Sequence, residues 1–323
     1  MVRQGTLGPV TLAALLLLLL VNLAPAQAAE SIRILSQNVN RLFDDVDNGN
    51  HEKVLSTQRF RNKVKIAARK IGDYYNLPEI IALQEVENLN VLGEVAGEIW
   101  QRYGLRYQLV LLPGQDISGI NLGYLIHPAL EIHEVDQLFA STRLDNSDHL
   151  LFSRPPLYLE LCRLDRCLSL LNLHLRSMRG IDSTEAAERD RVLAKRWQQG
   201  NRIATWVNRF QQANPGASLL LLGDFNALTP PDSKLDLAGI IRGNPDNGDS
   251  RRKASDLVEP DLVDLTLQIP EARRYSYIFR KQKQQLDYML VNSDFTPRLS
   301  TIEFGRIDYR FSDHAGLIAR FEW

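Results

Sequence analysis

The sequence has few cysteines, little net charge and no apolar run long enough to span a membrane. It contains two cysteines in 323 residues, and its 38 basic side chains nearly balance 39 acidic ones. A protein that binds nucleic acid through its overall charge is normally basic, so binding of a polyanion here would need a local patch. The sequence also lacks a Walker loop, a His-Glu-x-x-His zinc helix and a Gly-x-Ser-x-Gly elbow, which argues against three common hydrolase mechanisms.

The first 29 residues have the pattern of a secretory signal peptide. Arg3 precedes an apolar run at 12–21, and small residues at 24–29 offer a cleavage site after Ala28 or Ala29. The run is shorter than the roughly 20 residues of a membrane-spanning helix. An uncleaved anchor is the alternative. We therefore predict a secreted or periplasmic protein with one folded domain at 30–323, no membrane span after cleavage, and a monomeric chain.

Both cysteines lie in one short segment, 161–168. If Leu164 and Asp165 form a two-residue hairpin loop, Cys162 and Cys167 become a non-hydrogen-bonded cross-strand pair with close side chains. An exported protein meets oxidising surroundings, which favours a disulfide over two free thiols. No histidine or second cysteine pair lies nearby at zinc spacing, so the sequence does not predict a metal role for these thiols.

Alternating and short apolar runs predict many strands but only two long helices. Apolar residues recur at helical spacing from Phe60 to Tyr74 and from Leu193 to Phe210. The polar stretch 229–255 predicts a surface loop with at most one short helix near 234–240. Strands are predicted at 32–38, 79–85, 107–112, 123–127, 157–163, 167–175, 218–225, 262–267, 275–279, 285–291 and 316–321. This pattern predicts a four-layered α/β sandwich, in which helices flank two packed mixed β-sheets.

Polar residues gather at the ends of several apolar strands. Glu85 directly follows one such strand, and a carboxylate at a sheet edge suits a hard divalent cation. His174 alternates with leucines near the end of another strand. Four leucines at 219–222 predict a buried strand that ends in Gly223, after which Asp224 and Asn226 can point to the same side.

Two further motifs lie near the end of the chain. Asp287 opens one predicted strand, and Asp313 and His314 precede the last one. A carboxylate next to an imidazole fixes its tautomer and raises its basicity, so a distant aspartate and a histidine can form a catalytic pair. Each of these motifs alone is also compatible with an ordinary solvated strand end. Their convergence predicts a site for metal-assisted hydrolysis of a phosphoester, which needs a cation on the phosphoryl oxygens and a base for water.

The ordered series of motifs resembles the endonuclease/exonuclease/phosphatase superfamily over nearly all of the chain after residue 30. The series comprises 37–40 (Gln-Asn-Val-Asn), 83–85 (Leu-Gln-Glu), 172–174 (Asn-Leu-His), 223–227 (Gly-Asp-Phe-Asn-Ala), 286–287 (Leu-Asp) and 312–314 (Ser-Asp-His). Segments 152–157 and 275–279 are more similar to its secreted bacterial nucleases. One residue departs from the pattern, because Asn40 stands where many members have an acid.

The resemblance implies a role for each matching residue. Glu85 would bind the catalytic Mg²⁺, which Mn²⁺ could replace, with Asn38, Asn40 and Asp313 beside it. Asp224 and Asn226 would orient water and a phosphate oxygen. His314, backed by Asp287, would act as general base or stabilise the pentacovalent phosphorus, and His174 would donate to a phosphoryl oxygen or the leaving group. The resemblance leaves open whether Asp224 or His314 takes the proton.

Basic and aromatic residues near these motifs suggest the substrate. Arg176, Arg280 and Lys281 would contact phosphates, and Tyr277 would stack on a base. We therefore expect a nuclease that cleaves DNA or RNA. The alternatives are a phosphatase or phosphodiesterase acting on a small phosphoester, such as an inositol phosphate or sphingomyelin, and an inactive binding module with the same fold.

Overall fold

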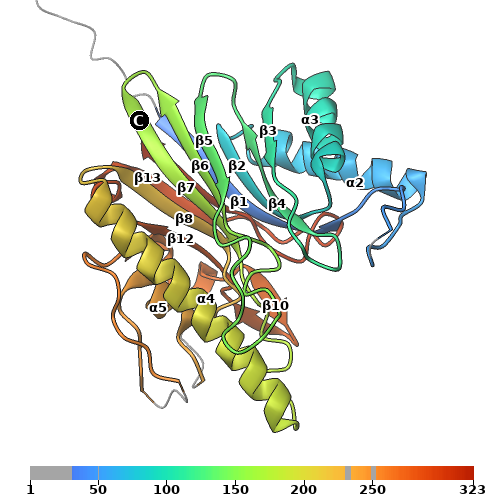
Figure 1. The fold of residues 1–323 in the computed structure, drawn as a ribbon. Helices are drawn as coiled ribbons and strands as arrows, with labels where there is room; N and C mark the ends of the chain where they lie inside the picture. The colour runs from blue at the N-terminus through green and yellow to red at the C-terminus, as the bar shows by residue number, and fades with distance from the viewer. Residues whose placement is uncertain (1–30, 50, 230–233, 249–251) are drawn as a thin grey trace, which may run out of the picture.

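The computed structural model describes residues 31–323 except residue 50, residues 230–233 and residues 249–251. The predicted signal peptide therefore lies outside the described residues. Two six-stranded sheets pack face to face within this part of the chain (Figure 1). In spatial order, the first contains β13 (Leu299–Phe304), β14 (Leu317–Glu322), β1 (Ser31–Leu42), β2 (Ile80–Val86), β4 (Asn121–Ile126) and β3 (Gln108–Leu111). The second contains β5 (Glu131–Gln137), β6 (Leu157–Arg163), β7 (Arg166–His174), β8 (Ser218–Asp224), β12 (Asp287–Val291) and β9 (Val263–Asp264).

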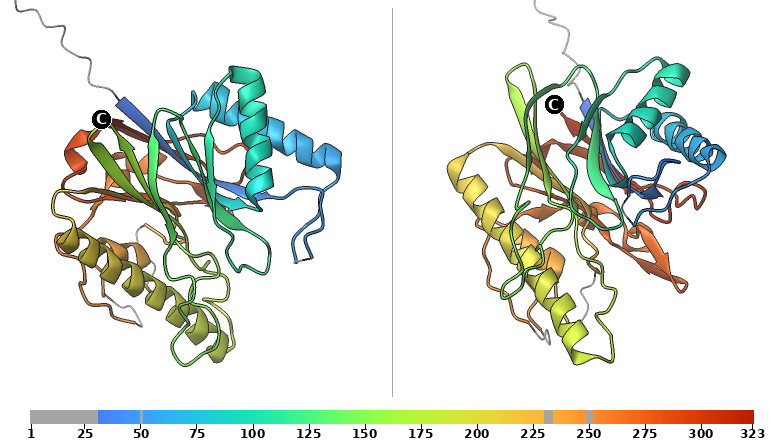
Figure 2. Two further views of the ribbon diagram at one scale, coloured as in Figure 1. Left: turned by 45° about the horizontal axis from the view of Figure 1, so that its top comes forward. Right: turned by 45° about the vertical axis from the view of Figure 1, so that its right-hand side comes forward.

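Both sheets are mixed, because each contains one parallel pair among antiparallel neighbours. β1 pairs in parallel with β2, and β7 pairs in parallel with β8. A separate two-stranded hairpin, β10 (Tyr277–Phe279) and β11 (Gln282–Gln284), projects from the sandwich (Figure 2). The parallel pairs matter for function because their carboxyl ends meet at one edge of the sandwich.

Helices cover the outer face of each sheet and complete the four layers. α2 (Thr57–Arg69) and α3 (Leu89–Tyr103) lie over the first sheet, and α4 (Ala186–Ala213) and α5 (Leu237–Arg242) over the second (Figures 1 and 2). The described residues also form four short helical segments: η1 (Lys70–Tyr74), η2 (Leu265–Gln268), η3 (Glu271–Arg273) and η4 (Thr296–Arg298). The sequence prediction of a four-layered α/β sandwich is confirmed.

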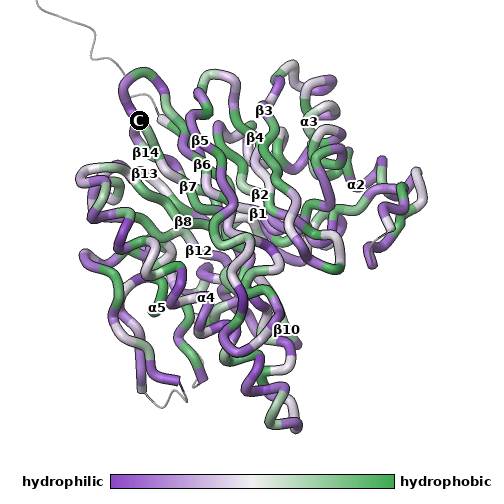
Figure 3. The backbone as a smooth tube through the Cα atoms, viewed as in Figure 1, coloured by the Kyte–Doolittle hydropathy of each residue, from purple (hydrophilic) through white to green (hydrophobic). Residues whose placement is uncertain are grey.

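Three apolar clusters hold the layers together. One fills the space between the sheets and includes Leu170, Leu220 and Met289, all fully buried. The other two join each sheet to its helices. Figure 3 shows the apolar segments concentrated on the central strands, with polar segments on the helices and loops around them. Burial of the strands on both faces explains why β8 reads as a continuous run of leucines.

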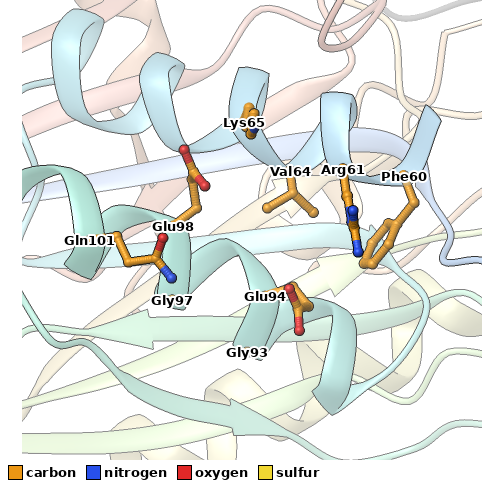
Figure 4. A pocket seen from close by; sticks show the side chains of 9 residues that line it. All are labelled: Phe60, Arg61, Val64, Lys65, Gly93, Glu94, Gly97, Glu98 and Gln101. Carbon is orange, nitrogen blue, oxygen red and sulfur yellow. The ribbon is translucent and has the colours of Figure 1, made fainter. Parts of the chain in front are cut away.

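The sequence prediction missed one long helix, α3. Its N-cap is Asn88, whose side chain accepts a hydrogen bond from the backbone N–H of Val91 at 2.9 Å. Gly93 and Gly97, which disfavour a helix, lie beside its apolar stripe and toward α2, where they border a cleft that contains none of the candidate catalytic residues (Figure 4). These glycines weakened the helical pattern, so only the packed structure reveals the helix.

The predicted strand at 262–267 is wrong over most of its length. The ladder ends after Asp264, and the chain turns into η2. The cause is local, because the Asp264 carboxylate accepts hydrogen bonds from the backbone N–H of Thr266 at 2.9 Å and from its hydroxyl at 2.5 Å. Strands β5 and β13 were not predicted, since both are partly exposed and lack a regular apolar alternation, and β5 is also rich in charged residues.

The predicted hairpin and disulfide are confirmed. β6 pairs with β7 in antiparallel register, with Cys162 opposite Cys167 and the two-residue turn at 164–165. Leu164 adopts a left-handed backbone (φ 56°), as the first turn position of such a hairpin requires. The two cysteines form a disulfide. Among the residues described, no helix is both long and apolar enough to cross a membrane.

Candidate active site

Four strand ends bring polar side chains from both sheets to one rim. The parallel register of β7 and β8 sets His174 beside Asp224, and the regular pairing of β1 with β2 breaks after Asn38 and Gln84, next to Glu85. Asn38 joins the two sheets through its amide. Its Nδ2 donates to Asp224 Oδ2 at 3.0 Å and to Glu85 Oε1 at 3.2 Å. The convergence predicted from the strand ends is therefore present in the structure.

The backbone departs from regular strand geometry at this rim. The pairing of β1 with β2 shifts after Asn38, and that of β2 with β4 shifts between Gln84 and Val86. Glu85 lies in this shift with a φ of 66°, and Asn226 has a φ of 51°. Bulges re-aim side chains, and residues in left-handed conformations concentrate at functional sites. Here the irregularity turns the Glu85 carboxylate toward Asn38.

Asp287 and His314 form a buried ion pair at the centre of the site. Asp287 pairs with Asp224 across the β8–β12 ladder, and its Oδ2 lies 2.8 Å from His314 Nδ1. Burial alone lowers the pKa of His314, but the carboxylates of Asp287 and Asp224 outweigh it and raise that pKa to about 10. His314 is therefore an imidazolium at neutral pH, and its Nε2 faces Asp224 Oδ2 at 3.8 Å.

Asp224 sits between both histidines and Asn38. Its Oδ1 accepts a hydrogen bond from the Asn226 N–H at 2.9 Å, which fixes the carboxylate. Burial raises the pKa of Asp224 to about 7, although the charge on His314 acts in the opposite direction. A carboxyl group that titrates near neutral pH can be ionised and still be basic enough to accept a proton.

His174 is buried and neutral. Burial lowers its pKa well below the usual value, and the positive charges of Arg154 and His314 act in the same direction. Its Nε2 lies 3.6 Å from Asp224 Oδ2 and 3.8 Å from Glu85 Oε1. Its Nδ1 is buried without a hydrogen-bond partner. The ring therefore has hydrogen-bonding capacity that the described protein atoms leave unused.

Asn40 and Asp313 lie beside this network. The Asn40 N–H donates to Asn38 Oδ1 at 2.9 Å, and its carbonyl accepts from Lys63 Nζ at 3.1 Å. Asp313 is only partly exposed, and its charge acts on His314 and Lys63. Lys63 also feels the charge of Glu85, although burial lowers its pKa. This lysine is a site residue that sequence reasoning missed, because it is one of many basic residues on an amphipathic helix.

The predicted substrate residues divide into two groups. Tyr277 lies against His314, with ring centroids 5.0 Å apart, and Arg280 and Lys281 form the exposed tip of the β10–β11 hairpin beyond it. Arg176 is half-buried, and its guanidinium already donates to Ser177 and to the Arg179 carbonyl within its own loop. The hairpin residues are thus the more available to a substrate.

Arg154 was not predicted as a site residue, yet it fixes the end of β7. It donates to the carbonyl oxygens of His174 at 3.3 Å and Leu175 at 3.2 Å, and it forms an ion pair with Asp116 at 2.6 Å. In the sequence, the segment 152–157 is notable only for its similarity to secreted bacterial nucleases. Asn226 contributes to the same region, because its Nδ2 donates to the Leu175 carbonyl at 3.2 Å.

The donor set fits a hard divalent cation. Glu85 is partly exposed, and its two carboxylate oxygens accept only from Asn38 and the Arg41 N–H among the described hydrogen bonds. Asn38 adds an amide oxygen, and Asp313 adds a second carboxylate nearby. Mg²⁺ is typically bound by one or two carboxylates together with several waters. These residues would hold such an ion, which supplies positive charge to phosphoryl oxygens when bound.

The paired mixed sheets have the fold seen in solved structures of endonuclease/exonuclease/phosphatase proteins. A family protein of that name from Leptotrichia buccalis superposes with a TM-score of 0.55 and 17% identity, over 90% of this chain and all of the other. D. rerio TDP2 complexed with a single-strand DNA product gives 0.57 and 16%, over 91% and 100%. The 3′ phosphatase NExo (D146N) from Neisseria, bound to a product DNA hairpin, gives 0.56 and 17%, over 90% and 100%.

The shared fold confirms the architecture implied by the sequence resemblance. At these identities the likeness concerns the fold, and the chemistry must be argued from the residues of this chain. No known family's sequence profile matches the chain. No curated protein sequence matches it either.

Proposed function

We propose that this chain is an exported, Mg²⁺-dependent phosphodiesterase that hydrolyses nucleic acid, with DNA as its principal substrate. The observation that carries the proposal is the buried network from Asp287 through His314 and Asp224 to Asn38 and Glu85. In it, one carboxyl group with a pKa of about 7 faces an imidazolium with a pKa of about 10. Titratable neighbours whose pKa values are driven apart are characteristic of acid–base catalysis.

Asp224 is the general base in this proposal. A base must be unprotonated before it reacts, and the His314 pKa of about 10 leaves its imidazole protonated at neutral pH. Burial raises the pKa of Asp224, so its carboxylate is more basic than that of an ordinary aspartate and can accept a proton from water. Asn38 and the Asn226 N–H orient its carboxylate. Asn226 is then a positioning residue, because its side-chain amide is engaged with Leu175.

The two histidines stabilise negative charge on the phosphoryl group. His314 is held by Asp287 at Nδ1, so its Nε2–H can donate to a phosphoryl oxygen. The neutral His174 presents Nε2 toward Glu85 and Asp224, where it can contact a second oxygen or the leaving group. Positioned donors of this kind in a buried site stabilise developing charge. A cation held by Glu85 and Asn38 would supply further positive charge to the same oxygens.

A nucleic acid suits the surroundings of this site. Tyr277 beside His314 offers a face for base stacking, and Arg280 and Lys281 offer charge for a phosphate backbone. Two of the superposed structures are described as bound to DNA products, which supports DNA as the first choice. A small phosphoester remains the second candidate substrate, because nothing in the proton transfer requires a polymer.

Export rests on two features of the chain. The first 29 residues have the composition of a signal peptide, and the described part contains a disulfide. Disulfides persist in oxidising compartments and are rare in reducing ones. We therefore propose a secreted or periplasmic location.

The test is a substrate panel with the purified protein. Plasmid DNA, single-stranded DNA, RNA, inositol phosphates and sphingomyelin would be incubated with Mg²⁺ or Mn²⁺, and separately with a chelator. We expect DNA cleavage that stops in the chelator and returns with added metal. Cleavage confined to a small phosphoester would replace DNA as the substrate. If none of these phosphoesters reacts with either metal, the inactive binding module becomes the better account.

A further inference from the structure

A second cluster of potential metal ligands lies at the opposite end of β7 from the catalytic rim. It combines His133 of β5 and Glu160 of β6 with the cysteines of the β6–β7 hairpin. One ligand atom from each of these four residues lies within 4.8 Å of all the others. Cys167 and His174 are seven residues apart on β7, which separates the cluster from the rim by about 23 Å. Figures 1 and 2 show this hairpin at one end and the β10–β11 hairpin toward the other.

The contacts within the cluster are centred on the imidazole of His133. Its Nδ1 lies 3.3 Å from Cys162 Sγ and 3.9 Å from Glu160 Oε1. Glu160 and Cys162 are two residues apart on β6 and therefore share one face of the sheet. Cys167 faces Cys162 across the hairpin. Three neighbouring strands thus point an imidazole, a carboxylate and two sulfurs at one small volume.

A β-bulge places the histidine. The register of β5 against β6 pairs Ile132 with Leu161 and Glu134 with Glu160, so His133 is the extra residue between them. Bulges re-aim a side chain that regular alternation would send elsewhere. Here the bulged residue is the one whose ring contacts Cys162. The bulge is a feature of the backbone and does not depend on the chemistry of the side chains. It also directs His133 toward Cys162.

We propose that reduction of the Cys162–Cys167 disulfide converts this cluster into a binding site for Zn²⁺, with His133, Glu160 and both cysteine thiolates as ligands. Zinc in proteins is most often held in tetrahedral geometry by four ligands drawn from cysteine, histidine and carboxylate side chains. Disulfide sulfurs are poor ligands, whereas thiolates bind strongly. The disulfide and the metal are then alternative ways of closing the same hairpin.

The conversion balances with a phosphine as reductant. The phosphine gives two electrons to the disulfide and takes an oxygen atom from water, so the products are two thiols and a phosphine oxide. Binding of Zn²⁺ then displaces one proton from each thiol, because the thiolate is the ligand. No oxidant or further reactant takes part. Sequence spacing alone could not reveal this site, since His133 lies 29 residues before Cys162 and reaches it through strand pairing.

Cobalt titration of the whole protein tests the proposal. Protein reduced with a water-soluble phosphine would be titrated with Co²⁺ in excess Mg²⁺, which occupies the oxygen-rich rim. We expect one equivalent of Co²⁺ to give the intense absorption of tetrahedral thiolate coordination, and Zn²⁺ to displace it. Oxidised protein should give no such absorption. Absence of the band from reduced protein, or an equal band in oxidised protein, would overturn the site.

Matched variants separate the proposed ligands from chance metal binding. His133→Ala should weaken Co²⁺ binding by more than roughly tenfold, since loss of even an outer-shell partner costs that much. Glu160→Gln should act in the same direction. His149→Ala removes an exposed imidazole elsewhere on the chain and should leave the titration unchanged. Circular dichroism of each variant verifies the fold. Unchanged affinity in folded His133→Ala would contradict the proposed ligand set.

Discussion

The two ends of β7 are built on different principles. At the carboxyl end, His174 joins side chains that come from every part of the chain, including Asn38, Asp224 and His314. At the other end, Cys162 and Cys167 lie on one hairpin, and the cluster is completed by Glu160 of the same hairpin and His133 of the adjacent β5. The first end depends on the whole fold, whereas the second depends on one hairpin and its neighbours.

The difference also concerns charge. The rim holds titratable groups whose pKa values are far from their ordinary ranges. Burial lowers the pKa of His174 and raises that of Asp224, whereas the neighbouring carboxylates raise the pKa of His314 against the effect of burial. The cysteine end is more open, and the His133 side chain there is 47% exposed. Buried charge requires exact partners, and those partners must be held by packing. Substitutions should therefore have larger consequences at the rim than at the hairpin.

The largest expected difference is in catalysis. His314→Ala removes the imidazolium beside Asp224 and should lower turnover on the order of a thousandfold with the fold retained. The double variant Cys162→Ser/Cys167→Ser alters the far end and should keep activity within about twofold, since distant sites act independently. Both would be assayed on the best substrate of the panel. Near-wild-type rates for folded His314→Ala would remove its catalytic assignment.

The sequence predicted the layers and most rim residues because both depend on local patterns. Buried strands read as apolar runs, and the residues that follow them are visible in the sequence. It did not predict α3, whose two glycines disfavour a helix, or β5, whose exposed surface is charged. Lys63 and Arg154 were missed because their placement depends on how α2 and the 152–157 loop pack against the sheets. Long-range packing leaves no local pattern in the sequence.

A second comparison uses two glycines, Gly216 before β8 and Gly223 near its end. Gly223 has a φ of 133°, and a β-carbon there would overlap the Leu173 carbonyl of β7. Gly216 also has a left-handed backbone, with a φ of 80°, but a β-carbon would meet nothing within 4 Å. Gly216→Ala should therefore cost about 1 kcal/mol from backbone strain alone. Gly223→Ala should cost roughly 3 kcal/mol or more, because steric overlap is added to the strain.

Urea unfolding of both glycine variants measures this difference directly. The free energies of unfolding would be compared with that of the wild type in the presence of a chelator, so that metal binding does not contribute. Equal losses for the two variants would show that close packing of β7 against Gly223 is unimportant for stability.

The last comparison concerns the dependence of the free energy of unfolding on pH, which changes gradually. His314 has a pKa of about 10 in the folded protein and an ordinary value of 6.5, so the native state keeps a proton that the unfolded state loses as pH rises above 6.5. Asp224 has a folded pKa of about 7 against 3.8, and its contribution has the same sign. The contribution of both groups to stability is thus greatest at low pH, and it is lost as the pH rises through their pKa values in the folded protein.

The expected slope follows from proton counting. In a chelator, the free energy of unfolding should fall between pH 6.5 and 8, by about 1.4 kcal/mol per pH unit for each proton that only the native state retains. Above pH 8 the trend is opposed, because burial lowers the pKa of Lys195 to about 8 and the native state then releases a proton first. The double variant His314→Gln/Asp224→Asn removes these two titrations and should be nearly flat between pH 7 and 8, above the pH at which His174 titrates in the unfolded chain. As a control, His149→Gln removes an exposed imidazole away from both ends of β7 and should keep the wild-type slope. If the double variant kept a slope as steep as that of the wild type, the titrating groups would lie elsewhere in the molecule.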